Sequence, residues 1–209
     1  MKKLSAIIVI TLVCSTFFLS QCTENKTTDA NNKKDTVLVE TKPVTYGGYE
    51  NQQKWGEHLV MSIGCGDCHT PKKMGAHGPE DDSTLLLSGH PAKMPPPDVD
   101  RKAQEAKGIF SSQTLTAWVG PWGISYAANL TSDTTGIGMW SEDQFIYALR
   151  NGKQKGLAGG RMLLPPMPWP SLKNLTDDEL KAIFAYLKST RPIVNVVPAA
   201  APPVSQPKM

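Results

Sequence analysis

Apolar residues recur with a helical period near the end of the chain. Leu180, Ile183, Phe184 and Leu187 fall at the i, i+3, i+4, i+7 spacing that is typical of a buried helix face. This spacing predicts an amphipathic helix that begins at Thr176 and packs one side into a core.

Helix starts are marked by capping patterns. Thr176 stands three residues before Glu179, and Ser141 stands three residues before Gln144, which is the spacing of a capping box. Gly152 is suited to end the helix that begins at Ser141, because glycine readily adopts the left-handed conformation after a last helical turn. Two helices are therefore expected in the second half of the chain.

A further helix is expected over residues 50–64, where Trp55 and Leu59 share one face and Gly64 ends the helix. No convincing run of alternating apolar and polar residues predicts a strand, and no internal repeat is evident. The expected fold class is therefore mainly α, with a single domain over residues 46–191 and long loops between its helices.

The first residues have the pattern of an export signal. Two lysines precede the apolar run 4–19, which is short for a membrane span and typical of a signal-peptide core. Residues 19–22 resemble the lipobox of bacterial lipoproteins, although Gln21 replaces the usual small residue. We expect a signal peptide over 1–21 and a diacylglyceryl group on Cys22; the alternative is an ordinary secreted protein.

Two polar or proline-rich segments flank the domain. Residues 22–45 lack periodicity and predict a flexible tether between the lipid and the domain. Residues 192–209 contain five prolines and three consecutive alanines, which predicts a disordered tail. The expected location is the periplasmic side of a bacterial membrane.

Composition narrows the class of protein. The formal net charge is +3, and no basic cluster is long enough to predict nucleic-acid binding. Of the four cysteines, Cys14 leaves with the signal peptide and Cys22 carries lipid. Cys65 and Cys68 remain, which is too few for a disulfide framework.

Residues 65–69 carry the sequence C-x-x-C-H, the attachment signature of c-type haem. The two thiols of Cys65 and Cys68 add to the two porphyrin vinyl groups, and the adjacent His69 binds iron. A zinc site needs two further ligands, and a thioredoxin-like redox pair needs a βαβ context, neither of which the sequence offers. One covalent haem c is therefore expected.

Met167 is the first candidate for the sixth iron ligand. Prolines stand on both sides of it, and a stiff loop can hold a weak thioether ligand at little ordering cost. Met162 and Met94 are alternatives, and His90 and His77 are the two candidates for bis-histidine ligation.

Three segments resemble the class I cytochrome c domain, in particular that of the cytochrome subunits of membrane-bound alcohol, aldehyde and gluconate dehydrogenases. These segments are 65–70, 121–153 and 163–189, so the resemblance covers most of residues 50–190. It implies a class I cytochrome c fold with Met167 as the axial ligand. The chain departs from those subunits in having one C-x-x-C-H sequence and a long insertion-like segment over 72–120.

The resemblance also implies that residues 126–131 lie near the haem propionates. Asn129 could then donate a hydrogen bond to a propionate, although a turn-forming asparagine is the alternative interpretation. Both interpretations concern the same residue, Asn129.

The expected function is transfer of single electrons between a membrane or periplasmic dehydrogenase and a respiratory acceptor such as an oxidase or another cytochrome. Two strong protein ligands leave no open iron position, so no catalytic residue is expected. The alternative is a haem-dependent oxidoreductase subunit or a gas sensor, either of which needs a labile sixth ligand.

Overall fold

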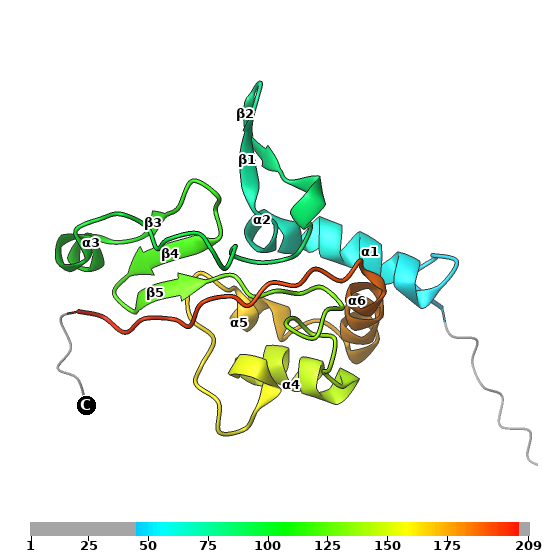
Figure 1. Cartoon of the computed structure of the whole chain (residues 1–209). Coiled ribbons are helices and arrows are strands. Elements are labelled where there is room, and N and C mark those ends of the chain that lie inside the picture. The colour runs from blue at the N-terminus through cyan, green and yellow to red at the C-terminus, as the bar shows by residue number, and fades with distance from the viewer. Residues whose placement is uncertain (1–44, 205–209) are drawn as a thin grey trace, which may run out of the picture. The chain divides into compact units, whose positions relative to one another are not determined.

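The computed structural model describes residues 45–204. The predicted signal peptide, Cys22 and nearly all of the predicted tether lie outside this range. Along the chain the elements are α1 (Gln52–Ile63), α2 (Cys65–His69), β1 (Lys72–Gly75), β2 (Gly78–Asp81), η1 (Ser83–Leu85), α3 (Arg101–Lys107), β3 (Phe110–Ser111), β4 (Ala117–Gly120), β5 (Gly123–Tyr126), α4 (Glu142–Asn151), η2 (Gln154–Gly156), α5 (Trp169–Leu172) and α6 (Asp177–Ser189) (Figure 1).

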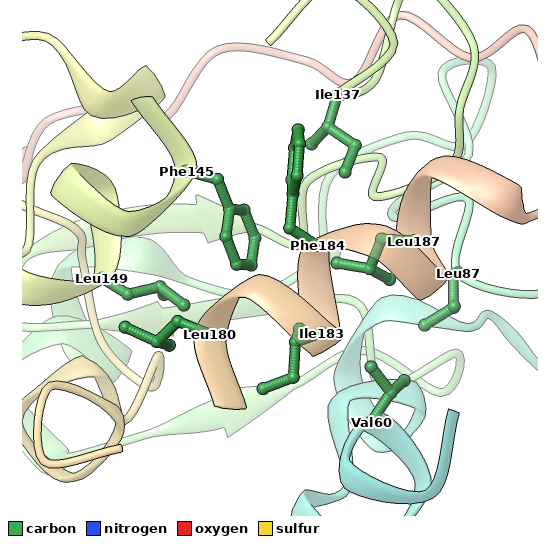
Figure 2. Close-up of a cluster of buried hydrophobic side chains, with 9 residues drawn as sticks. All are labelled: Val60, Leu87, Ile137, Phe145, Leu149, Leu180, Ile183, Phe184 and Leu187. Carbon is green, nitrogen blue, oxygen red and sulfur yellow. The ribbon is translucent and has the colours of Figure 1, made fainter. Parts of the chain in front are cut away.

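The core forms where α6 packs against α1 and α4. The apolar face predicted for the last helix is confirmed, because its four residues are all buried. Figure 2 shows these side chains between Val60 of α1 and Phe145 of α4. The rings of Phe145 and Phe184 lie 5.3 Å apart. The buried cluster consists of Val60, Leu87, Ile137, Phe145, Leu149, Leu180, Ile183, Phe184 and Leu187.

The predicted helix boundaries are confirmed by their caps. Thr176 and Glu179 form a complete capping box, in which each side chain bonds the other residue's backbone N–H. The Ser141 hydroxyl accepts from the Gln144 N–H at 3.1 Å, and Gly152 ends α4 at a φ of 61°. These local signals are sufficient because capping involves only residues within one turn.

The expectation of a domain without strands is wrong for the insertion-like segment 72–120 and the residues just after it. β1 pairs with β2 in a hairpin, and β3, β4 and β5 form a small antiparallel sheet. The strands have at most four residues, and every residue of β4 is buried, so no alternation of polar and apolar positions marks them. The expected mainly helical fold class is confirmed for residues 45–204, with two short sheets added to the helices.

Leu87 joins this insertion to the helical core. Its side chain is 1% exposed and belongs to the same cluster as Val60 and Leu187. Its φ of 60° is unusual for a residue with a branched side chain, so packing holds it in this conformation. The segment after β2 is therefore part of the domain rather than a loop lying on its surface.

The prediction of a disordered tail is wrong for residues 192–204, which we call the C-terminal strap. Figure 1 shows this segment in red, running from α6 past β5. Ala201 and Ile124 exchange two backbone hydrogen bonds of 2.8 and 3.0 Å, and the Val204 N–H bonds Glu105. Proline-rich composition suggested disorder, but the residues between the prolines keep the N–H groups that pair with the domain.

Within residues 45–204, no helix combines the length and the apolar character needed to cross a membrane.

We expect Leu180→Ala to lower the free energy of unfolding by about 2–5 kcal/mol, because it leaves a cavity where no side-chain surface is exposed. Leu157 is 54% exposed, so Leu157→Ala should change stability by less than about 0.5 kcal/mol. Urea unfolding of both variants measures the difference. An equal decrease in the free energy of unfolding of the two variants would contradict the assignment of Leu180 to the core.

Candidate haem-binding site

The two haem-attachment cysteines lie on one short helix. α2 covers residues 65–69, so Cys65 and Cys68 are three residues apart and face the same side of a single turn. Both thiols are free and partly buried. His69 is the last residue of the helix and is buried. The sequence motif therefore has the geometry that attachment at two points and one adjacent iron ligand requires.

Gly64 forms the junction between α1 and α2. Its φ of 79° and ψ of 32° are left-handed, and it ends α1 while directly preceding Cys65. The chain turns at this residue, so α2 leaves α1 in a new direction immediately before the first cysteine. A residue with a Cβ atom is strained in this conformation.

Burial raises the pKa of Cys65 to about 11, and it also raises the pKa of Cys68. The Asp67 carboxylate adds to both shifts, while the Lys72 ammonium acts against the shift at Cys68. Near neutral pH both sulfurs are therefore held as uncharged thiols. That form suits a site that encloses a large apolar ring.

The orientation of His69 is set by one hydrogen bond. Its Nδ1 lies 2.7 Å from the carbonyl oxygen of Ala128. A carbonyl oxygen can only accept, so Nδ1 carries the proton and the lone pair is on Nε2. Burial lowers the pKa of the imidazole, and the Ala128 bond opposes that shift. A neutral imidazole with a free Nε2 is the form that binds iron.

Lys72 closes the carbonyl end of the haem-attachment helix, a contact that the sequence analysis missed. Its Nζ donates to the carbonyl oxygens of Gly66 and Thr70, both at 3.0 Å, and pairs with Asp81 at 2.6 Å. Only 10% of the Lys72 side chain is exposed. A basic residue just after a helix end is a recognised capping signal, so the pattern was present in the sequence.

Met167 lies in the loop before α5, and its N–H donates to the Leu164 carbonyl at 3.2 Å. Its partly buried side chain packs against the hydrophobic cluster of Figure 2, which Cys65 also contacts. The structure therefore brings Met167 and Cys65 to the same core from positions about a hundred residues apart. Its role as an iron ligand stays a prediction.

The four other candidates for the sixth iron ligand lie in surroundings that differ from those of Met167. Met162 is 42% exposed, and the Met94 sulfur accepts a hydrogen bond from Thr114. His77 is exposed in the β1–β2 turn. His90 is fully buried, with Nδ1 2.9 Å from the Thr116 hydroxyl and its ring 4.8 Å from that of Tyr126. Met94 is partly buried but is not among the hydrophobic side chains that pack against the cluster that Met167 contacts.

The side chain of Asn129 has protein hydrogen-bond partners in the structure, and its contact with a haem propionate stays a prediction. Its side-chain N–H₂ donates to the Ile193 carbonyl at 2.8 Å and to the Thr135 hydroxyl at 3.2 Å, so both hydrogens have protein acceptors. Its Oδ1 accepts from the Thr131 N–H at 2.9 Å. This bond from the residue two positions further along forms an Asx turn, which is the geometry of the turn-forming alternative.

The donor set fits haem c. It offers two uncharged thiols three residues apart, a histidine of fixed tautomer beside them, and a methionine at the same core. These features define a protein with a covalently attached haem. The Cytochrome c family model matches residues 53–191, and the chain belongs to this family. Its cofactor is one covalent haem c, and it is an electron-transfer haem protein.

The chain is also similar to cytochrome subunits of bacterial dehydrogenases. It is 28% identical over 163 residues, 78% of this chain, to the fructose dehydrogenase cytochrome subunit of Gluconobacter japonicus. It is 34% identical over 141 residues, 64% of this chain, to the quinone-type alcohol dehydrogenase cytochrome c subunit of Gluconobacter oxydans. It is 45% identical over 67 residues, 32% of this chain, to the gluconate 2-dehydrogenase cytochrome c subunit of Pantoea cypripedii.

These matches confirm the resemblance to dehydrogenase cytochrome subunits. The aligned part covers 25%, 23% and 14% of the length of those three relatives, respectively. The chain therefore corresponds to a small part of each of them.

We expect Gly64→Ala to lower the free energy of unfolding by about 1 kcal/mol or more, because alanine is strained at a φ of 79°. Gly159→Ala is the matched control, since no atom lies within 4 Å of the added methyl group. Urea unfolding and the haem content of both variants test this. If the two variants were equally stable, the left-handed junction would not constrain the site.

Proposed function

We propose that this protein is a monohaem electron carrier with His69 and Met167 as the two iron ligands. The observation that supports this most strongly is the packing of Met167 and Cys65 against one hydrophobic cluster. Met167 lies in a loop that contains Pro165, Pro166 and Pro168, so the loop has little conformational entropy to lose on ligation. A second protein ligand leaves no iron position for a substrate.

The bound haem supplies one-electron chemistry at its iron. The protein's part is to bind, orient and enclose it. His69 is oriented by its hydrogen bond to Ala128, Cys65 and Cys68 would attach the haem, and the apolar cluster that Met167 and Cys65 contact would help to enclose it. Thioether ligation and a low-dielectric pocket both favour ferrous iron, so the reduction potential is higher than with two histidine ligands.

The bound haem would exchange single electrons with a partner protein without forming a bond to it. The donor in this proposal is a membrane or periplasmic dehydrogenase, which is supported by the names of the relatives. The acceptor is a respiratory oxidase or another cytochrome. Removal of residues 1–21 takes away two lysines and leaves the chain close to neutral, so long-range charge contributes little to partner choice.

The proposed location is the periplasmic side of a bacterial membrane, with Cys22 carrying the lipid anchor. The support comes from the apolar run 4–19 followed by the lipobox-like residues 19–22. Attachment of c-type haem outside the cytoplasm agrees with export. Residues 23–44 then separate the lipid from the domain.

We expect the oxidised protein to show a far-red sulfur-to-iron band that disappears in Met167→Ala, because that variant removes the thioether ligand. The potential of the variant should fall, and its reduced form should bind carbon monoxide at once. Met162→Ala is the control and should keep the band, since Met162 is 42% exposed.

The same spectra distinguish the proposed electron carrier from the competing functions. If the native reduced protein binds carbon monoxide at once, its sixth position is open, and a haem enzyme or gas sensor replaces the carrier. If the band is absent and carbon monoxide does not bind, another side chain is the ligand, and His90 is then the first to replace.

We expect Cys22→Ala to move the protein from the membrane fraction to the soluble periplasmic fraction, because the lipidated sulfur is removed. Cys14→Ala keeps the proposed lipidation site and should stay with the membrane. Fractionation and incorporation of labelled fatty acid measure both. A Cys22→Ala protein that still sediments with membranes and carries label would exclude lipidation at this cysteine.

A further inference from the structure

Two chain segments form hydrogen bonds with His69, one with its backbone carbonyl and the other with its imidazole ring. The Gly89 N–H donates to the backbone carbonyl of His69 at 2.8 Å, and the Ala128 carbonyl accepts from the imidazole Nδ1 at 2.7 Å. The two segments also bond each other, because the His90 N–H donates to the Ala127 carbonyl at 2.9 Å. The position of the imidazole therefore depends on where these segments are fixed.

Asn195 of the C-terminal strap fixes the first segment. Its side-chain N–H₂ donates to the carbonyls of Ser88 and His90 at 2.7 and 2.9 Å. Its Oδ1 accepts from the Ala92 N–H at 2.8 Å. All three hydrogen bonds reach residues 88–92, so one side chain of the strap binds both neighbours of Gly89 in the chain.

The strap also fixes the second segment. The Ile193 carbonyl accepts from Asn129, and the Ile193 N–H donates to the Thr131 hydroxyl at 3.2 Å. The Asn195 N–H donates to the Thr135 hydroxyl at 2.9 Å. Asn129 is 4% exposed and Thr131 is fully buried, so water does not readily replace these partners.

We propose that Asn195 is a positioning residue for the axial histidine: through residues 88–92 and 128–135 it holds the Ala128 carbonyl against Nδ1 of His69. A hydrogen bond of this kind fixes the tautomer and orientation of a ligating histidine and raises its basicity. The strap would thereby act on the histidine ligand through hydrogen bonds within the protein. This inference rests on the proposed ligation of iron by His69.

The test is NMR of the reduced, haem-loaded, full-length protein, in which low-spin ferrous iron is diamagnetic. The Nδ1 proton of His69 is the reporter. In Asn195→Ala we expect its exchange with solvent to accelerate about fivefold or more, the factor that corresponds to loss of a typical hydrogen bond. Its resonance should also shift as the bond to Ala128 lengthens.

Val194→Ala is the matched control. It lies in the same strap, but its side chain is 79% exposed. Exchange of the His69 proton in this variant should equal that of the native protein. Thr135→Ala is a second test, because it removes the acceptor of the Asn195 N–H and one acceptor of Asn129 while leaving the contacts to residues 88–92 in place. It should accelerate exchange even if Asn195→Ala fails to fold.

If the strap only stabilises the fold and does not position His69, the experiment gives a different result. Both variants would then lose stability in urea while the His69 proton kept its native shift and exchange rate, and that outcome would overturn the proposal. If no Nδ1 proton shifted by haem is found for His69 in the native protein, the proposed ligation itself fails. The two failures are therefore distinct.

Discussion

The hydrogen bond between His69 and Ala128 is the constraint on which the site depends. α2 has only five residues, so it can present two sulfurs and an imidazole but cannot also hold the imidazole ring in place. The acceptor comes from a segment 59 residues further along the chain. Everything that positions this segment, including the core and the strap, therefore contributes to the orientation of the His69 imidazole, the proposed iron ligand.

Features that depend on neighbouring residues could be predicted from the sequence. The haem-attachment motif, the caps at Ser141 and Thr176, and the buried face of α6 all involve residues within two turns of one another. Such local features can be predicted because a capping hydroxyl has few possible backbone partners, and an apolar helix face has few possible placements other than the core. The family resemblance rested on the same local patterns.

Features that depend on distant partners could not be predicted. Asn129 has the local chemistry of a turn, and nothing near it indicates that its amide bonds Ile193, 64 residues away. The strap has a composition that is typical of disorder, and its order comes from backbone groups that meet the edge of β5. β5 itself is too short to show alternation. Composition reports average tendencies, whereas these contacts depend on the folded partner.

The strap also has a consequence for the order in which the molecule assembles. Asn195 bonds residues as far as 107 positions upstream, and such long closures carry a high entropic cost until the intervening chain has folded. The strap therefore docks late, after α1, α4 and α6 have formed their core. Before the strap docks, its hydrogen bonds to Ser88, His90 and Asn129 are absent, so we expect the segments around His69 to be less firmly held at that stage.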